Sequence, residues 1–316
     1  MTDAVFQIRS AGPLVSVQDG GRPGLMRFGV PNSGPMDRKA LTIANTALGN
    51  PAGAAGIEVS LGGLVMDLVE GAVTLAIAGG GFIVEAGAQR LGSWAVFTLR
   101  AGDTLTIRRG PWGAWTCLAF AGALDTPTWL GSASTHALSG FGGGRLKAGD
   151  TLTVRNTRLL DDDRLLPCPV SARPRNRLHA VFGPQGRCFV PEARGALFGA
   201  PYQVTDAADR MGVRLRGSPL ELNGALSIPS EPILRGSVQV AGDGMPAVLM
   251  ADHQTTGGYP KIATVLADDL DGFAQLRPRD PVGFIEISPE RAVAIARQRA
   301  QSFATYLSSI ARRASA

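Results

Sequence analysis

The sequence has few of the residues on which metal and disulfide sites depend. Its 316 residues include three cysteines and three histidines. Cys117, Cys168 and Cys188 have neither the close spacing of a zinc site nor an even number for disulfide pairing. The histidines are too few and too far apart in sequence to suggest metal ligation. We therefore expect reduced thiols and no metal.

Charge and hydropathy argue against two classes of partner. The formal net charge is +5, but the basic residues are scattered and are not interleaved with aromatic residues as on a nucleic-acid-binding surface. The chain has no uncharged apolar run of about eighteen residues that could cross a membrane. Residues 1–10 also lack the basic start and apolar stretch of a signal peptide. We expect a soluble, cytoplasmic protein that binds a small molecule, and neither nucleic acid nor membrane.

Aromatic residues are scarce, at 6%, whereas glycine (41) and proline (21) are abundant. This composition favours many short strands and tight turns, and hence a mainly β fold with few helices. A phrase also recurs: "LRAGDTLTIRR" from Leu99, "LKAGDTLTVRN" from Leu146 and, more loosely, "LRPRDPVGFIE" from Leu276. Each copy predicts a turn followed by a strand with one buried face. Three such units indicate related β substructures.

Two lobes are expected from the length and from one irregular stretch. Residues 155–177 are charged, contain prolines and show no periodicity. We therefore predict a linker at about 156–175, an N-terminal β-rich lobe over 1–160 and a C-terminal β lobe over 175–316.

Two helices are predicted. The first starts near Ser33 as its N-cap, with Pro35 close behind, and ends at Gly49. The second runs from Ser288 to about Arg312 and carries a narrow apolar stripe. This stripe either packs on the chain's own core or docks on a partner protein. It consists of Val293, Ala296, Ala300, Phe303, Leu307 and Ile310.

The stretch "QTTGGYPK", Gln254 to Lys261, holds more kinds of hydrogen-bonding group than a turn needs. We expect it to be a polar loop between a strand at 248–250 and a strand at 262–266. Gly257 and Gly258 permit positive φ and leave backbone N–H groups open to an anion or a carbonyl oxygen. The alternative is a simple hairpin that carries polar residues and no site.

The side chains of this loop complete a candidate site. Lys261 supplies a compact cation. Gln254 can both donate and accept, which suits an amide or ureido group. The other candidates in the loop are hydroxyl groups, those of Thr255, Thr256 and Tyr259.

A second polar cluster lies near the N-terminus. Gln18, Asp19 and Arg22 surround two glycines, and Asp19 with Arg22 is expected to form a local ion pair. Ser33 is either a helix cap or a ligand contact, because a helix N-terminus favours anions. Glu58 stands among apolar neighbours on a short predicted strand, so it needs a partner or has a raised pKa. It is an acid–base candidate or an arginine partner.

The second half of the chain adds three candidates. Gln185 follows a Gly-Pro corner, Gln239 lies inside an alternating strand, and Arg210 belongs to "DRMG", which could also be a structural salt-bridge turn. Several familiar motifs are absent: the P-loop, GxSxG, HExxH and the Rossmann glycine pattern. "GGGF" at 79–82 lacks the lysine and hydroxyl that a phosphate cradle needs.

Several of these stretches together resemble one family. They are "VSVQDGGRPGLMRFGVPNSGPMD", "GPQ", "DRMG" and "GSVQVAGDGMPAVLMADHQTTGGYPKIATV". They are similar to the biotin-dependent carboxyltransferase family, which also includes allophanate hydrolase subunit 2, KipA and the C subunit of 5-oxoprolinase. The resemblance covers about residues 5–286. Within it, His253 and Ala133 stand where the family commonly has arginine.

The resemblance implies a fold of cyclophilin-like β-barrels and a partner, the homologue of allophanate hydrolase subunit 1 or of the 5-oxoprolinase B subunit, with the A subunit as a further component. It implies a component of an ATP-dependent 5-oxoprolinase, which opens 5-oxo-L-proline to L-glutamate. ATP is held by the complex and is not assignable to this chain. The alternatives are a biotin-dependent carboxyltransferase component of urea-degrading enzymes and a KipA-like regulatory protein.

Both enzymatic chemistries polarise an amide or ureido carbonyl beside an anionic group, which fixed N–H donors and a cation achieve without reorganisation. The glycine amides and the two threonines of the loop would then receive the oxygen. Lys261 would hold the anion, and Gln254 and Gln185 would read the amide.

Overall fold

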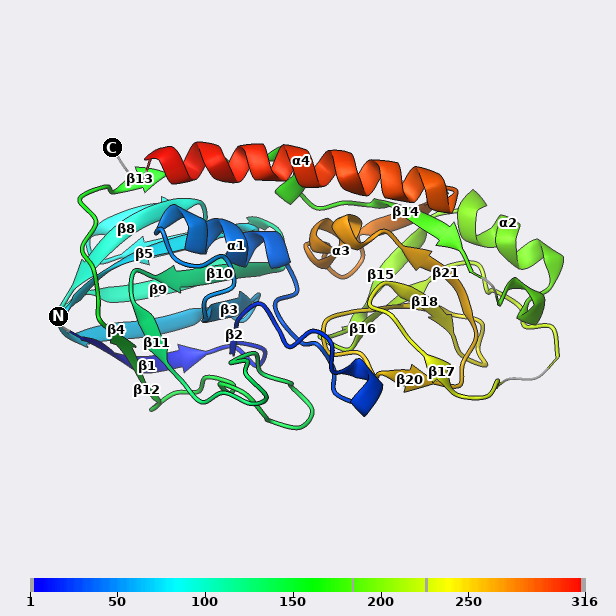
Figure 1. Cartoon of the computed structure of the whole chain (residues 1–316), viewed down its shortest axis with the longest axis horizontal. Coiled ribbons are helices and arrows are strands. Elements are labelled where there is room, and N and C mark those ends of the chain that lie inside the picture. Colours follow the sequence, from blue (N-terminus) through cyan, green and yellow to red (C-terminus); the bar gives the residue numbers. More distant parts are fainter. Residues whose placement is uncertain (1–2, 184, 225–226, 314–316) are drawn as a thin grey trace. The chain divides into compact units, whose positions relative to one another are not determined.

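The computed structural model describes residues 3–183, 185–224 and 227–313. The described chain divides into two compact units (Figure 1). Unit 1 contains residues 3–22, Ser33–Arg173 and the end of the chain from Phe303; unit 2 contains Pro23–Asn32 and Pro174–Ser302. Strands predominate and the described residues form four α-helices, which confirms the predicted mainly β fold with a C-terminal helix.

Unit 1 contains two antiparallel sheets, helix α1 (Arg38–Ala47) and, from Phe303, the last part of the C-terminal helix. The seven-stranded sheet has the order β11-β12-β1-β4-β9-β6-β7, and the six-stranded sheet has the order β13-β8-β5-β10-β3-β2. The strands are β1 (Ala4–Ala11), β2 (Ser16–Gln18), β3 (Gly56–Ser60), β4 (Leu64–Glu70), β5 (Ala72–Ala78), β6 (Gly81–Ala86), β7 (Gln89–Gly92), β8 (Ala95–Arg100), β9 (Thr104–Trp112), β10 (Trp115–Phe120), β11 (Ala123–Asp125), β12 (Thr151–Arg155) and β13 (Arg164–Leu165).

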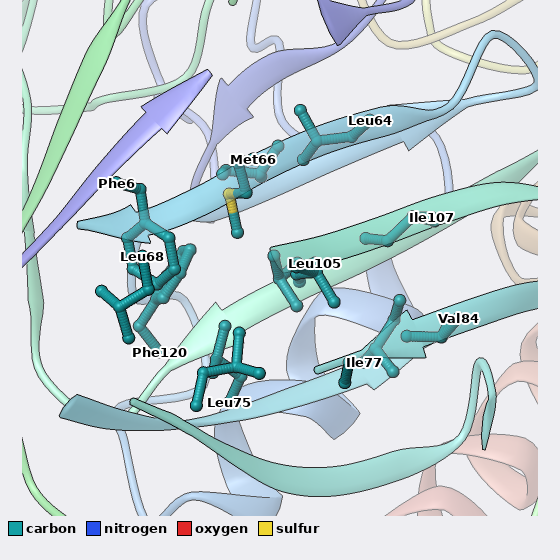
Figure 2. Close-up of a cluster of buried hydrophobic side chains, with 14 of the residues drawn as sticks. Phe6, Leu64, Met66, Leu68, Leu75, Ile77, Val84, Leu105, Ile107 and Phe120 are labelled. Atoms are coloured by element: carbon teal, nitrogen blue, oxygen red, sulfur yellow. The ribbon is translucent and has the colours of Figure 1, made fainter. Parts of the chain in front are cut away.

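The core of unit 1 is formed by side chains from both sheets, mostly from every second residue along a strand (Figure 2). On β1 the buried positions alternate, and Phe6 packs against Phe120 with ring centroids 5.7 Å apart. Strand β5 is buried almost throughout because it has apolar residues on both faces. Leu75 and Ile77 enter the core of Figure 2, while Ala76 enters a second cluster that includes residues of α1.

Helix α1 begins later than predicted. Its N-cap is Asp37, whose side chain accepts a hydrogen bond from the backbone N–H of Ala40 at 3.0 Å. The prediction that Ser33 caps this helix was wrong, because Ser33 has a left-handed φ of 53° and lies before the first turn. One face of α1 is buried, with Ala40, Ile43, Ala44 and Ala47 at most 1% exposed, and Met36, just before the helix, is buried as well.

Unit 2 contains a closed barrel with the strand order β14-β21-β18-β19-β16-β15-β22. It closes through a parallel pairing of β14 with β22. Two short helices, α2 (Pro191–Gly199) and α3 (Ala267–Ala274), accompany it. The barrel strands are β14 (Arg177–Phe182), β15 (Tyr202–Ala208), β16 (Gly212–Arg216), β18 (Ser237–Val240), β19 (Pro246–Leu249), β21 (Lys261–Val265) and β22 (Pro281–Glu286); a separate pair is β17 (Glu231–Pro232) with β20 (Thr256–Gly257).

The repeated phrase folds the same way three times, which confirms the predicted turn and strand. In each copy an aspartate Oδ2 accepts a hydrogen bond from the backbone N–H three residues earlier, and the residue before the aspartate has positive φ. The strands that follow are β9, β12 and β22. The donor–acceptor pairs are Arg100–Asp103 (2.8 Å), Lys147–Asp150 (2.9 Å) and Arg277–Asp280 (2.8 Å); the positive φ values are 98° at Gly102, 92° at Gly149 and 77° at Arg279.

The C-terminal helix, α4 (Pro289–Arg313), has two kinds of surface. In unit 1, Ile310 is 1% exposed within the cluster that contains Ile43, and Phe303 and Leu307 pack against that cluster. This part of the stripe therefore lies on the chain's own core, as one of the two alternatives predicted. In unit 2, Val293 is 49% exposed. Among the described helices, none is long and apolar enough to cross a membrane.

Candidate functional site

The polar loop from Met250 to Pro260 connects two barrel strands that are not neighbours. Strand β18 lies between β19 and β21 and pairs antiparallel with both. The loop is therefore not the simple hairpin that was the alternative prediction. Within it, β20 pairs with β17, with Gly257 opposite Glu231 and Thr256 opposite Pro232. This pairing joins the loop to a segment about twenty-five residues earlier in the chain.

The two glycines of the loop are explained by lack of space. Neither Gly257 nor Gly258 is among the described glycines with positive φ, so neither uses the backbone freedom that glycine permits. A Cβ on Gly257 would lie 2.5 Å from Ile233 Cδ1 and 3.1 Å from Gln239 Nε2. A Cβ on Gly258 would lie 3.0 Å from the backbone oxygen of Ile228. Both positions therefore bring the loop backbone close to neighbouring groups.

Gln185 links Lys261 to Glu231. Its Oε1 accepts a hydrogen bond from the backbone N–H of Lys261 at 2.8 Å, and its Nε2 donates to Glu231 Oε2. The Lys261 ammonium lies 3.8 Å from the same Glu231 oxygen; the Lys261 side chain is 13% exposed, and its Nζ is a buried atom with no hydrogen bond. Pro184, which precedes Gln185 in the predicted Gly-Pro corner, lies outside the described residues. The arrangement holds a poorly hydrated cation beside a fixed carboxylate.

A chain of carboxamides runs along the same part of the barrel. Gln254 Nε2 donates to Gln239 Oε1 at 3.4 Å, and Gln239 Nε2 donates to the backbone oxygen of Tyr259 at 3.4 Å. Thr255 is half-buried, whereas Thr256 and Tyr259 are exposed. Both ends of the Gln239 amide are therefore bonded within the chain, and Gln239 holds the Gln254 carboxamide in place.

Arg210 is part of a buried ion pair. Its Nε and Nη2 donate to the two oxygens of Asp252 at 2.9 and 3.0 Å, and both side chains are at most 2% exposed. The structural alternative for "DRMG" is therefore present, with Asp209 Oδ1 accepting from the backbone N–H of Met211 at 2.7 Å. The next residue after Asp252, His253, donates from Nδ1 to the backbone oxygen of Gln254 at 2.6 Å. Burial lowers the pKa of His253 below its ordinary value of 6.5.

The N-terminal cluster lies in unit 1 and is centred on Asp19. Its carboxylate accepts hydrogen bonds from the backbone N–H groups of Gly21 (2.8 Å) and Ala133 (2.7 Å) and from the hydroxyls of Ser132 and Ser134 (2.6 Å each). These contacts tie the start of the chain to the segment 132–134.

Arg22 is 2% exposed and contacts the same segment. It donates to the backbone oxygen of Ser134, and its guanidinium lies 4.9 Å from the centre of the Trp129 ring. A cation above an aromatic face gains about 0.5–2 kcal/mol, depending on its hydration.

Three further candidates of unit 1 are buried. Gln18 Nε2 donates to Ser16 and to the backbone oxygen of Thr135, whereas its Oε1 has no hydrogen bond among the described residues. Ser33 Oγ is likewise buried without one. Glu58 is 0% exposed on β3 and accepts from the backbone N–H of Met36, just before α1.

The candidate residues therefore form two groups, one in each unit. Unit 2 brings together Gln185, Gln239, Gln254 and Lys261 with the glycine-containing loop. Unit 1 holds the other group, namely Gln18, Asp19, Arg22, Ser33 and Glu58. The sequence reasoning missed Glu231. Its only signal was an acidic residue before a proline in "SEPIL", which is common in ordinary turns.

The described residues contain no evident metal site, and the glycine-rich stretch 79–82 is packed against the rest of the fold. No group of three His, Cys, Asp or Glu side chains that could hold a metal is present among them. The glycines of "GGGF" are filled by the fold: a Cβ would lie 2.9 Å from Ala40 Cβ at Gly79 and 2.7 Å from the Phe82 ring at Gly80. Close packing therefore accounts for these two glycines.

Comparison with known proteins decides the family. Residues 28–286 match the model of the carboxyltransferase domain, subdomains A and B. The chain belongs to this carboxyltransferase family. It is 37% identical over 307 residues to the C subunit of 5-oxoprolinase from Escherichia coli, with 95% of this chain and 96% of that protein covered.

Two solved structures share the fold within longer chains. TTHA0988 is 35% identical with a TM-score of 0.80, covering 89% of this chain and 55% of that one. The urea carboxylase of Kluyveromyces lactis is 26% identical with a TM-score of 0.85, covering 97% of this chain and 29% of that one. The chain thus corresponds to part of each of these larger chains.

Proposed function

We propose that this chain is the C subunit of an ATP-dependent 5-oxoprolinase, which converts 5-oxo-L-proline to L-glutamate together with homologues of the A and B subunits. The observation that carries the proposal is the 37% identity to the E. coli protein of that name, which extends over almost the full length of both chains. Because that relative is named as one subunit of an enzyme, it also supports the expectation that activity requires partner subunits.

The site in unit 2 supports a cyclic amide bearing a carboxylate as the substrate class. A lactam has a cis amide, with its N–H and C=O on the same side of the ring, so a glutamine carboxamide can meet both groups at once. Gln254 provides such a carboxamide, and Gln239 holds it in place by accepting a hydrogen bond from its Nε2. The Lys261 ammonium, buried without a hydrogen bond, suits the carboxylate or another oxyanion.

This arrangement revises one of the expected roles. Gln185 was expected to read the substrate amide, but its Oε1 and Nε2 already bond to Lys261 and Glu231. We assign Gln185 to positioning these two residues. We place ATP elsewhere in the complex and derive no step at the nucleotide from this chain.

Carboxyl transfer from carboxybiotin is the second candidate function, favoured by the likeness to the K. lactis urea carboxylase. A ureido group has the N–H and C=O groups that the Gln254 carboxamide could pair with, so the same residue suits biotin or urea. Biotin, when bound, would supply the carboxyl group.

Co-expression with homologues of the A and B subunits, followed by an assay of glutamate release from 5-oxo-L-proline, tests the proposal. We expect glutamate only when all subunits and ATP are present. Turnover of carboxybiotin without glutamate release would instead favour the second candidate.

A further inference from the structure

Glu231 is the carboxylate that the fold brings to the polar loop. It belongs to the two-residue strand β17, opposite Gly257 of β20. Its side chain is 45% exposed, and both of its close contacts use one oxygen, Oε2, which accepts from Gln185 and lies 3.8 Å from Lys261 Nζ. Oε1 is therefore the oxygen that can meet a ligand.

The other acidic residues considered for the site are committed to the chain itself. Glu58 is 0% exposed and bonds to the backbone before α1. Asp252 is 0% exposed and paired with Arg210. Asp19 accepts four hydrogen bonds within unit 1. A general base must reach the proton that it removes. Glu231, which is half-exposed beside the polar loop, satisfies this condition better than these three residues.

We propose that Glu231 is the acid–base residue of the reaction, with Lys261 and Gln185 fixing its position; this rests on the proposed function. Glu231 Oε1 takes a proton from water as the water oxygen bonds to the ring carbonyl carbon and the carbonyl π electrons move to oxygen. When those electrons return, the ring C–N bond breaks and its electron pair remains on nitrogen. The nitrogen then receives the proton from Glu231, which ends ionised as it began. A nucleoside triphosphate bound elsewhere in the complex would supply the free energy of the overall reaction.

Gln185 and Lys261 both contribute to the position of the Glu231 carboxylate. Gln185 holds Glu231 Oε2 and the backbone of Lys261 at the same time, so the carboxylate and the ammonium keep their spacing. Positioned acid–base groups contribute about 10²–10⁴-fold to a rate.

The assembled complex tests this role with a set of variants. We expect Glu231→Gln to lower kcat about 10²-fold or more with KM changed only a few-fold, because the amide keeps the size but cannot accept the proton. Glu231→Ala should lose as much and should recover at least about tenfold when formate is added, since a small carboxylate can occupy the space. The control, Glu221→Gln, changes an exposed glutamate of the same unit and should leave kcat unchanged.

A readout that needs no turnover examines the pairing itself. Treatment of the full-length chain with a carbodiimide should join Lys261 to Glu231 through an amide bond, detected by peptide mass spectrometry, and Glu231→Gln should abolish this product. Absence of the product in the wild type would overturn the pairing.

The outcomes separate the two proposals. A near-normal kcat in Glu231→Gln, or a loss in Glu231→Ala that formate does not relieve, overturns the acid–base role. If Lys261 and Glu231 cross-link but the wild-type complex releases no glutamate, the proposed function is refuted. The same variants are then measured in carboxyl transfer, where an amide proton must also be removed. A wild-type complex inactive in both assays overturns the acid–base role as well.

Discussion

The buried pair of Arg210 and Asp252 makes the sharpest prediction about what holds the polar loop in place. Asp252 lies two residues before Gln254, and its two oxygens accept from the Arg210 guanidinium at 2.9 and 3.0 Å. Removing one member of a buried ion pair costs about 3–5 kcal/mol, because the remaining charge loses its counterion in a poorly hydrated place. We expect Asp252→Asn to lower the free energy of unfolding by this amount.

The same unit offers a matched control. Arg214 and Asp243 also form an ion pair, but their side chains are 45% and 47% exposed. Exposed pairs contribute about 0.2–1 kcal/mol, so Asp243→Asn should change stability by no more than this. The two variants differ in burial and not in the kind of group removed.

Urea unfolding measures both variants, with far-UV circular dichroism as the probe of the whole chain. Tryptophan fluorescence adds a signal from unit 1, because all four tryptophans lie there: Trp94, Trp112, Trp115 and Trp129. We expect the dichroism midpoint of Asp252→Asn to fall well below that of Asp243→Asn. Equal losses of about 1 kcal/mol or less in the two variants would refute the reasoning and make Arg210 a candidate ligand contact again.

Three further predictions concern α4, the loop glycine and His253. Ile310→Ala should lower the free energy of unfolding by about 2–5 kcal/mol in urea, because Ile310 is 1% exposed. Val293→Ala is the control and should lower it by less than about 0.5 kcal/mol, because Val293 is 49% exposed. Equal losses would contradict packing of the apolar stripe on unit 1. Gly257→Ala should reduce glutamate formation by the complex, because the added Cβ would meet the side chains of Ile233 and Gln239. Gly195→Ala is the control and should leave activity intact, because a Cβ there has nothing within 4 Å. A fully active Gly257→Ala would show that the reaction does not depend on the close contact between Gly257 and Gln239. Burial lowers the pKa of His253, so the unfolded chain binds the proton at a higher pH than the folded chain does. The free energy of unfolding should therefore fall as the pH drops below about 6.5. His253→Gln should flatten this part of the stability–pH curve, and an unchanged slope would contradict the prediction.

The sequence predicted those features that depend on local pattern. Glycine and proline content indicated the β-rich fold, and the Ala-Gly-Asp phrase predicted two of the three turns that the structure repeats. The third turn is less evident, because Arg279 occupies a left-handed position that glycine usually fills. The start of α1 was misplaced because Ser33 and Asp37 are equally good N-caps by composition, and only the backbone distinguishes them.

The features that the sequence did not predict depend on contacts between distant segments. Glu231 meets Lys261 only because β17 pairs with β20, and no local pattern around residue 231 indicates that pairing. Position 257 likewise requires glycine because the side chains of Ile233 and Gln239 lie against it, and these residues are distant from it in sequence. A polar residue's bonding state is also set by distant neighbours, so Gln185 was assigned to the substrate although both ends of its amide are occupied.

One measurement tests the central claim most directly: glutamate release from 5-oxo-L-proline by the complex that contains Lys261→Met. The side chain keeps its approximate length and loses its charge, so the complex should still assemble, as checked by size-exclusion chromatography. We expect the rate to fall about a hundredfold or more, because a positioned charged donor is removed from the reaction site. A correctly assembled complex that releases glutamate at the wild-type rate would contradict the placement of the site at this loop.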